Sequence, residues 1–179
     1  MAVLALLLFP PVSVAEEAVP IATQVPILFK LFSMDKNLSR HGGSEFSFAL
    51  FFDSKNGESR RQREEFERTL GGGRKVGGLL IAFRAYDVSE GMDFEKVLQE
   101  SAGLYAAAGI ERHLDKILSA SRARSVTAAS GSASLAEKGF AIGFEIDQGR
   151  PRIVINLPAA KAQGCDFSAD VLKLARVIR

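Results

Sequence analysis

The feature that most constrains the fold of this chain is the spacing of its apolar residues, which changes along its length. Over residues 46–52 large apolar side chains stand at every second position, the period of a buried β-strand. Short apolar runs follow at residues 79–83, 104–108 and 125–129, and segments with helical features separate them. Strands that alternate with helices predict an α/β fold with a mainly parallel sheet flanked by helices on both faces.

Residues 140–157 predict an antiparallel hairpin, because two alternating apolar runs flank the turn Asp147-Gln148-Gly149-Arg150. We expect this hairpin to add an antiparallel edge to the sheet. Five apolar residues could share one of its faces: Phe140, Ile142, Phe144, Ile153 and Ile155. Their burial would make the hairpin mainly a core element. Arg150 and Arg152, beside the turn, are candidate contacts for a ligand or partner.

The first predicted helix lies between residues 19 and 38, where Ile21, Val25, Leu28 and Phe32 have the spacing of one helix face. Pro26 fits only the first turn of a regular helix. The helix should therefore begin near Val25 or be kinked at Pro26.

A second helix is predicted from Ser59, which forms a capping-box pattern with Gln62. Phe66 and Leu70 are its only large apolar residues, so it should lie on the surface, and the glycines at 71–73 should end it. The charges from Glu58 to Lys75 could form a docking face or simply a solvated surface.

The last part of the chain predicts two helices. Pro158 suits the first turn of a short helix that Gly164 ends. Ser168 is expected to cap a terminal helix that contains Val171, Leu172, Leu174, Ala175 and Ile178.

Residues 1–15 are interpreted as an export signal, which leaves residues 16–179 as one domain. The segment is almost wholly apolar, and Ser13-Val14-Ala15 before Glu16 resembles a signal-peptidase site, although no Lys or Arg precedes it. It is shorter than the roughly 20 residues needed to span a bilayer. We expect a periplasmic, soluble product without direct membrane insertion.

Charge and cysteine content argue against a nucleic-acid-binding protein and against a protein stabilised by an intrachain disulfide. Twenty-three basic against twenty-one acidic residues give a net charge of +2, which does not suggest a nucleic-acid binder. Cys165 is the only cysteine, so no intrachain disulfide can form. It could pair between chains, but we favour a quiet, half-buried thiol.

The sequence offers little catalytic chemistry. His41 and His113 stand in no nucleophile or metal-ligand signature, and we expect each to be a surface or helix-capping residue. Residues 71–75 suggest a phosphate loop, but these glycines follow a helix instead of preceding one, which favours a helix C-cap. We therefore predict no catalytic residue, metal or cofactor.

The loop Ser130-Gly131-Ser132 leads from a predicted strand into a predicted helix. In a parallel sheet such a loop lies at the carboxyl edge, where open α/β sheets bind ligands. These three residues are candidate ligand or partner contacts. The alternative is an ordinary strand-to-helix turn with a serine N-cap.

The C-terminal segments resemble a known family. The residues concerned are Gly139-Phe140-Ala141-Ile142-Gly143-Phe144, Gly149-Arg150-Pro151-Arg152, Ile155-Asn156-Leu157, Ala159-Ala160-Lys161-Ala162 and Leu172-Lys173-Leu174-Ala175. Together they resemble the closing region of the YfiR-like (YfiR/HmsC) periplasmic regulatory proteins. Near the front, Leu28-Phe29-Lys30-Leu31 and Asp35-Lys36-Asn37-Leu38 are similar to that family's first helix and its end.

This resemblance implies a non-enzymatic periplasmic regulator. YfiR-like proteins bind the periplasmic domain of an inner-membrane diguanylate cyclase and hold it inactive, and release raises cyclic-di-GMP and promotes biofilm. They are α/β domains that tend to form homodimers. The best-known members have stabilising disulfides, which the single Cys165 does not allow within this chain.

Three functional hypotheses follow. A repressor that acts by protein contact would be a dimer with an exposed apolar or charged patch. A small-ligand sensor that feeds a histidine kinase or another receptor would have a pocket near residues 130–132. An envelope enzyme would need converging titratable side chains with shifted pKa values, and we expect none.

Overall fold

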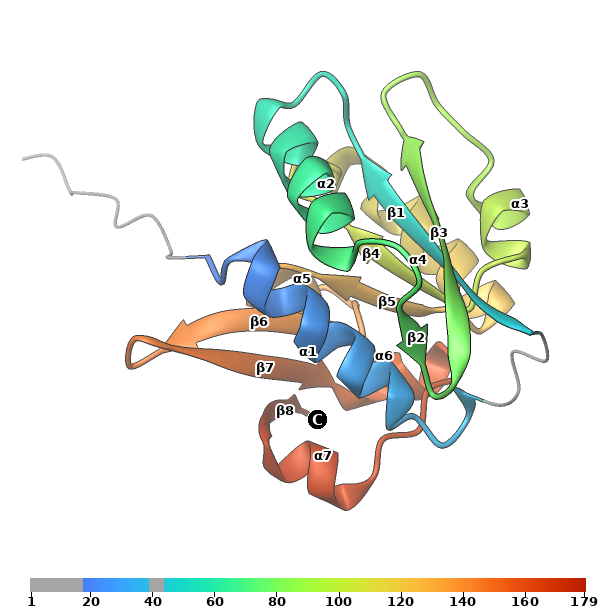
Figure 1. Cartoon of the computed structure of the whole chain (residues 1–179). Coiled ribbons are helices and arrows are strands. Elements are labelled where there is room, and N and C mark those ends of the chain that lie inside the picture. The colour runs from blue at the N-terminus through green and yellow to red at the C-terminus, as the bar shows by residue number, and fades with distance from the viewer. Residues whose placement is uncertain (1–17, 39–43) are drawn as a thin grey trace, which may run out of the picture.

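The computed structural model describes residues 18–38 and 44–179. The expected signal at residues 1–15 and His41 lie outside this part of the chain. Within it, eight strands form one sheet in the order β2-β3-β1-β4-β5-β6-β7-β8 (Figure 1). The strands are β1 (Glu45–Phe52), β2 (Lys75–Val76), β3 (Leu79–Asp87), β4 (Gly103–Ala106), β5 (Thr127–Ser130), β6 (Ile142–Asp147), β7 (Arg150–Asn156) and β8 (Ala175–Ile178).

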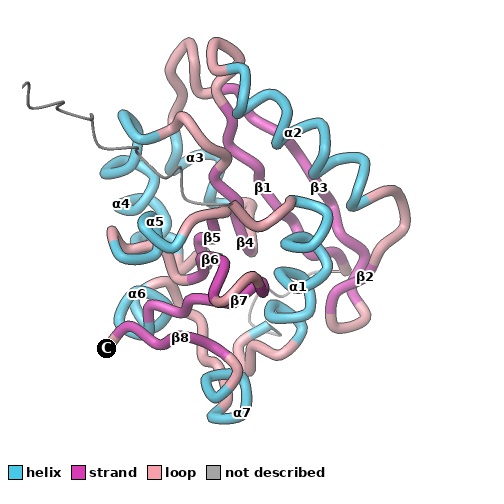
Figure 2. Tube along the Cα trace, turned by 90° about the vertical axis from the view of Figure 1, so that its left-hand side faces the viewer, coloured by secondary structure: helices cyan, strands magenta, loops and turns pink. Residues whose placement is uncertain are grey.

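Helices cover both faces of this sheet, as the alternation of strands and helices predicts (Figure 2). α1 (Ile21–Ser33) and α2 (Gly57–Leu70) pack on one face. α3 (Phe94–Gln99) and α4 (Leu114–Arg124) pack on the other. The other helices of the described residues are short: η2 (Glu111–His113), α5 (Ala133–Glu137), α6 (Leu157–Ala162) and α7 (Ala169–Lys173).

The sheet is mainly parallel, and the expected hairpin is present. β3, β1, β4, β5 and β6 are successive parallel neighbours, whereas β6 and β7 pair antiparallel around Gln148 and Gly149. The prediction that the hairpin forms the edge was wrong. β8 pairs parallel with β7 and lies outside it.

β8 also corrects the expected terminal helix. Ser168 does cap a helix, but α7 ends at Lys173, and Ala175 and Ile178 belong to β8. A short apolar run fits either period, and tertiary contacts decide between them. Here the strand is held by β7 and by Arg176, whose guanidinium lies 3.0 Å from carboxylate oxygens of Glu137 and Glu145.

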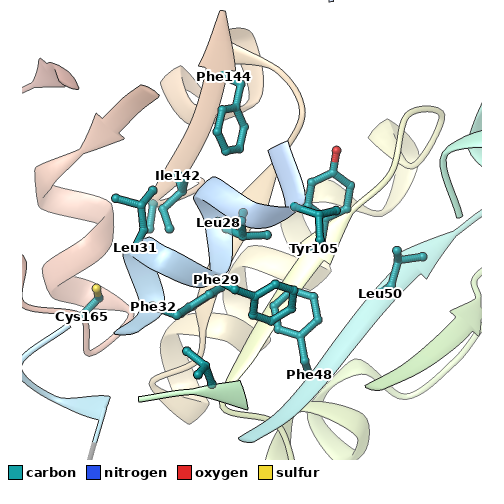
Figure 3. Packing of buried hydrophobic residues seen from close by; sticks show 14 of the residues in the cluster. Leu28, Phe29, Leu31, Phe32, Phe48, Leu50, Tyr105, Ile142, Phe144 and Cys165 are labelled. Atoms are coloured by element: carbon teal, nitrogen blue, oxygen red, sulfur yellow. The ribbon is translucent and has the colours of Figure 1, made fainter. Parts of the chain in front are cut away.

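β1 is buried on both sides, and this fixes the two parts of the core. Phe46, Phe48 and Leu50 face α1 and α2, and Figure 3 shows part of this cluster. Ala49 and Phe51 face α3 and α4. The strand is therefore the element that both helical layers share.

The aromatic part of the first cluster is formed by three elements. Phe29 of α1 and Phe66 of α2 lie 4.9 and 5.8 Å, between ring centroids, from Phe48 of β1. Phe66 and Leu70 are buried, as expected of the only large apolar residues of α2. A largely charged helix is thus anchored to the sheet through these two side chains.

One of our two expectations for Pro26, that α1 begins near Val25, was wrong. The helix begins at Ile21 and contains Pro26. Proline removes one helical hydrogen bond, to the carbonyl of the residue four positions earlier. That residue, Ala22, is exposed, so water can satisfy its carbonyl group.

The predicted capping box of α2 was wrong. Asn56 is the N-cap, and its side chain accepts hydrogen bonds from the N–H groups of Glu58 and Ser59. Ser59 is buried inside the first turn, where its hydroxyl accepts the N–H of Asp53 at 2.9 Å. Gln62 is therefore free to point to another part of the molecule.

The inward face of the hairpin contains four of the five expected residues. Ile142, Phe144, Ile153 and Ile155 pack with the α1 cluster. Phe140 lies instead in the α3–α4 cluster, because β6 begins only at Ile142. The hairpin is a core element, as predicted.

Candidate functional site

The order of the strands creates an opening at the carboxyl edge of the sheet. From β1 the chain first crosses to β3 on one side, and from β3 it crosses to β4 on the other side. The segments that follow β1 and β4 therefore leave in opposite directions. Ligands of open α/β sheets bind at such a switch point.

A cavity of about 370 Å³ lies at this edge. Its walls come from the start of α2, the end of β4 and the loop between β5 and α5. The lining residues are Ala18, Glu58, Gln62, Ala106, Ala108, Glu111, Gly131, Ser132, Ser134, Leu135 and Lys138. A second hollow of about 310 Å³ adjoins it and shares Ala18, Glu58, Gln62 and Gly131. We call the first the switch-point cavity.

The loop that the sequence singled out does reach this cavity. Gly131 and Ser132 line it, whereas Ser130 is buried at the end of β5 and donates its hydroxyl proton to the carbonyl of Ser132 at 3.1 Å. Ser132 also caps α5, since its hydroxyl accepts the N–H of Ser134 at 3.1 Å. Both interpretations of the loop are thus compatible with its structure.

Gly131 lies against a buried polar pair. A Cβ atom at this position would lie 2.7 Å from the hydroxyl of Tyr105 and 3.0 Å from Nε2 of Gln24. The Tyr105 hydroxyl donates to Oε1 of Gln24 at 2.8 Å, and Gln24 donates to the carbonyl of Val19. Burial is the main reason why the pKa of Tyr105 is raised, and the nearby Glu65 adds to this rise. The pair therefore stays neutral and holds α1 to the floor of the site.

Sequence analysis missed Gln62 as a site residue, and it placed Glu58 only in a possible charged docking face. Gln62 accepts the N–H of Ala108 at 2.9 Å, directly after β4, and donates to Glu58 at 3.2 Å. Glu58 also pairs with Arg61. The sequence did contain one signal for these two residues, because both lie in the first turns of the helix that follows β1.

The charges around the cavity are mixed. Glu58 and Glu111 are acidic, and Lys138 is basic. Lys138 is exposed and has no ion pair with any residue that the structure describes. The rim can therefore meet either sign of charge, while Ala106, Ala108 and Leu135 supply an apolar wall.

Asp53, which is buried directly after β1, forms an ion pair with the half-exposed Arg112 at the same edge of the sheet. Its carboxylate accepts from Arg112 at 2.9 Å, and Arg112 also donates to His113 at 2.9 Å. Desolvation, and then the cations of Arg112 and Lys116, lower the pKa of His113. His113 stands at the N-cap position of α4, but its side chain makes no capping hydrogen bond, and its ring packs against Phe94.

Asp87, at the end of β3, is held as a carboxylate. Desolvation is the largest single influence and raises its pKa, but the hydrogen bonds from Ser54 and Ser89 together outweigh it and lower the pKa to about 2. The main-chain N–H groups of these serines lie 3.1 and 2.9 Å from one carboxylate oxygen. These bonds join the loops after β1 and β3.

Arg150 and Arg152 do not join the loop at residues 130–132. They lie on the exposed hairpin, and neither lines the two hollows at the carboxyl edge. Arg152 pairs with Asp147 at 2.6 Å, whereas Arg150 has no ion pair within the described residues. The candidate residues thus form two separate surfaces.

The glycines at 71–73 and Cys165 have structural roles. Gly71 ends α2 with a φ of 59°, which agrees with the C-cap interpretation. Cys165 is a free thiol that is only 2 % exposed, so it is fully buried and not half-buried as expected. Burial is the main cause that raises its pKa, and Asp35 adds to this effect.

Neither a metal site nor a membrane span is found within residues 18–38 and 44–179. No three His, Cys, Asp or Glu side chains there are grouped so that they could bind a metal ion. None of the helices in these ranges is both long and apolar enough to cross a bilayer.

A family model described as YfiR/HmsC-like matches residues 47–176 of the chain. No curated protein matches it in sequence.

Solved structures of other proteins share the fold, among them the following three. The ABC domain from Streptococcus pneumonia, solved with L-Trp, has a TM-score of 0.62, 16% identity and coverage of 89% of this chain and 62% of that one. A conserved domain protein from Vibrio cholerae has a TM-score of 0.66, 13% identity and coverage of 92% and 62%. The ligand-free, open structure of the substrate-binding protein CD0873 from Clostridium difficile has a TM-score of 0.56 and 9% identity, and the match covers 80% of this chain and 58% of that one. The chain thus spans about three fifths of the length of these structures, and at such identities the likeness shows the fold alone.

Gly131→Ala should destabilise the protein, because the added methyl group would meet Tyr105 and Gln24. We expect a loss of about 1–3 kcal/mol in the free energy of unfolding, measured by chemical denaturation. Gly72→Ala is the control, since a Cβ there meets nothing within 4 Å. Equal stability of the two variants would contradict this expectation and would show that the loop accommodates the methyl group without a loss of stability.

Cys165 should make the protein less stable at alkaline pH. The buried thiol stays protonated in the native state, while in the unfolded chain it ionises above a pKa of about 8.5. The raised native pKa therefore stabilises the fold below that pH, and this contribution is lost as the pH rises.

Denaturation between about pH 8 and pH 10 should show a steeper loss of stability for the native chain than for Cys165→Ala. Tyr105 is common to both proteins, so the difference reports the thiol. Parallel pH profiles would contradict this account.

Proposed function

The chain belongs to the YfiR/HmsC-like family of periplasmic regulators of cyclic-di-GMP signalling, and we propose that it binds the periplasmic domain of an inner-membrane signalling protein and represses it. A diguanylate cyclase is the proposed target, so binding lowers cyclic-di-GMP and biofilm formation. The chain acts by contact and not by catalysis, after export and removal of residues 1–15.

The family match carries this proposal. It begins in β1 and ends in β8, so it includes the strands of the parallel sheet as well as the hairpin. The match therefore involves the whole framework of the sheet and does not depend on the C-terminal motif alone.

The two ends of the sheet support a function in protein contact. Within the described residues, Leu80 and Leu174 are the large apolar side chains that are exposed, at 39% and 72%. Leu80 lies in β3 opposite Lys75 of the short β2, which pairs only with the first residues of β3, and Leu174 directly precedes the edge strand β8. Open strand edges are natural pairing surfaces. We propose that the β8 end forms the homodimer and leaves the β3 end to the receptor.

A second candidate function is a small-ligand sensor that feeds a histidine kinase or another receptor. The observation that favours it is the switch-point cavity, which contains Gly131 and Ser132 at the edge where α/β sheets bind ligands. Because one structure of similar fold was solved with L-Trp, this amino acid is the first ligand to test. A rise in melting temperature with L-Trp, absent in Gly131→Ala, would support the sensor.

Deletion of the gene in its own bacterium tests the repressor proposal. Cyclic-di-GMP, measured in cell extracts by mass spectrometry, should rise when the protein is lost, because the cyclase is released. The wild-type gene should restore the low level, whereas a version that lacks residues 1–15 should not. An unchanged or lower cyclic-di-GMP level after deletion would contradict repression.

A further inference from the structure

We propose that a groove between α1 and β2 receives an extended acidic segment of the regulated receptor, an inference that rests on the function proposed above. The groove has a volume of about 290 Å³ and lies outside the switch-point cavity. Its lining residues are Pro26, Phe29, Lys30, Ser33, Arg74, Lys75 and Ile81. We call it the basic groove.

One wall of the basic groove is a single stripe of α1. Pro26, Phe29, Lys30 and Ser33 stand at positions i, i+3, i+4 and i+7, so they lie on the same face of the helix. Phe29 is anchored in the aromatic cluster and is only 7% exposed. The stripe thus presents a fixed surface with one cation near its end.

The opposite wall is held by strand pairing. Lys75 lies opposite Leu80 in the β2–β3 ladder, and the N–H of Ile81 donates to the carbonyl of Arg74 at 3.0 Å. The backbone of both cationic residues is therefore fixed beside β3. Cations from two independent elements border one hollow.

The charge of the basic groove has one sign. None of its lining residues is acidic, and Lys30, Arg74 and Lys75 form no ion pair with the described residues. Some other surface cations are paired within the chain, for example Lys36 with Asp166 and Arg124 with Glu95. The three cations are thus available to carboxylates of a partner, which they would attract and orient.

The shape favours a protein segment over a membrane surface. A flat bilayer would touch only the rims of the groove, whereas side chains of an extended segment can reach the apolar floor at Phe29 and Ile81. β3 also offers main-chain groups next to the groove. Beyond the pairing with β2, the part of β3 that ends at Asp87 has no strand on its outer side within the described residues. An extended segment can add to such an edge.

Short synthetic peptides test the chemistry of the groove without the receptor. A fluorescent peptide that alternates glutamate and valine should bind the purified mature protein, and its affinity should fall as salt rises. The variant Lys30→Glu/Lys75→Glu should bind at least about tenfold more weakly. Lys96→Glu is the control for the charge reversal at Lys30 and at Lys75, because Lys96 is exposed on α3, on the other face of the sheet.

Three results of this experiment would overturn the assignment. The first is that the matched glutamine–valine peptide binds equally well. The second is that Lys96→Glu weakens binding as much as Lys75→Glu alone. The third is that the protein binds phosphatidylglycerol vesicles but not the peptide. Lys75→Gln, which removes the charge without reversing it, should lose less affinity than Lys75→Glu, and melting curves should show that every variant is folded.

Complementation in cells separates this inference from the proposed function. If deletion of the gene leaves cyclic-di-GMP unchanged, the proposed function fails. If deletion raises cyclic-di-GMP but Lys30→Glu/Lys75→Glu restores the low level as well as the wild type, only the groove assignment fails. We expect the Lys96→Glu protein to restore repression and the groove variant not to restore it.

Discussion

Burial of β1 on both faces is the constraint on which the rest of the structure depends. Phe46, Phe48 and Leu50 pack beneath α1 and α2, and Ala49 and Phe51 pack against α3 and α4. Each large apolar side chain buried in this way contributes about 1.5–3 kcal/mol. Because β3 and β4 pair in parallel on its two sides, β1 also sets the point where the chain changes direction. The switch-point cavity is a consequence of that arrangement.

α1 connects the two surfaces that matter most for function. Near its start, Gln24 accepts a hydrogen bond from the Tyr105 hydroxyl beside Gly131, which lines both hollows at the carboxyl edge of the sheet. Toward its end, Phe29 and Lys30 line the basic groove. Phe29 also packs on Phe48 and so attaches the helix to β1. One helix thus spans from the candidate ligand site to the candidate receptor site.

The sequence predicted those parts of the fold that are determined by residues close together in the chain. The alternating run at β1, the hairpin turn and the C-cap at Gly71 follow from the period of two and from glycine conformation. The loop at residues 130–132 was placed correctly at the carboxyl edge, because only the polarity of strand and helix was needed. Tertiary contacts decided the rest. Ser59 is held by the backbone of Asp53, which leaves capping to Asn56, and Gln62 reaches the segment after β4.

Direct binding to a receptor tests the central claim, repression by protein contact. The periplasmic domains of the membrane-bound diguanylate cyclases encoded in the same genome can be purified and titrated with the mature chain in a calorimeter. The account predicts that one of these domains forms a stable stoichiometric complex and that the purified full-length cyclase loses activity in that complex. If no domain binds, or if the bound cyclase keeps its full activity, the protein is not a repressor that acts by contact.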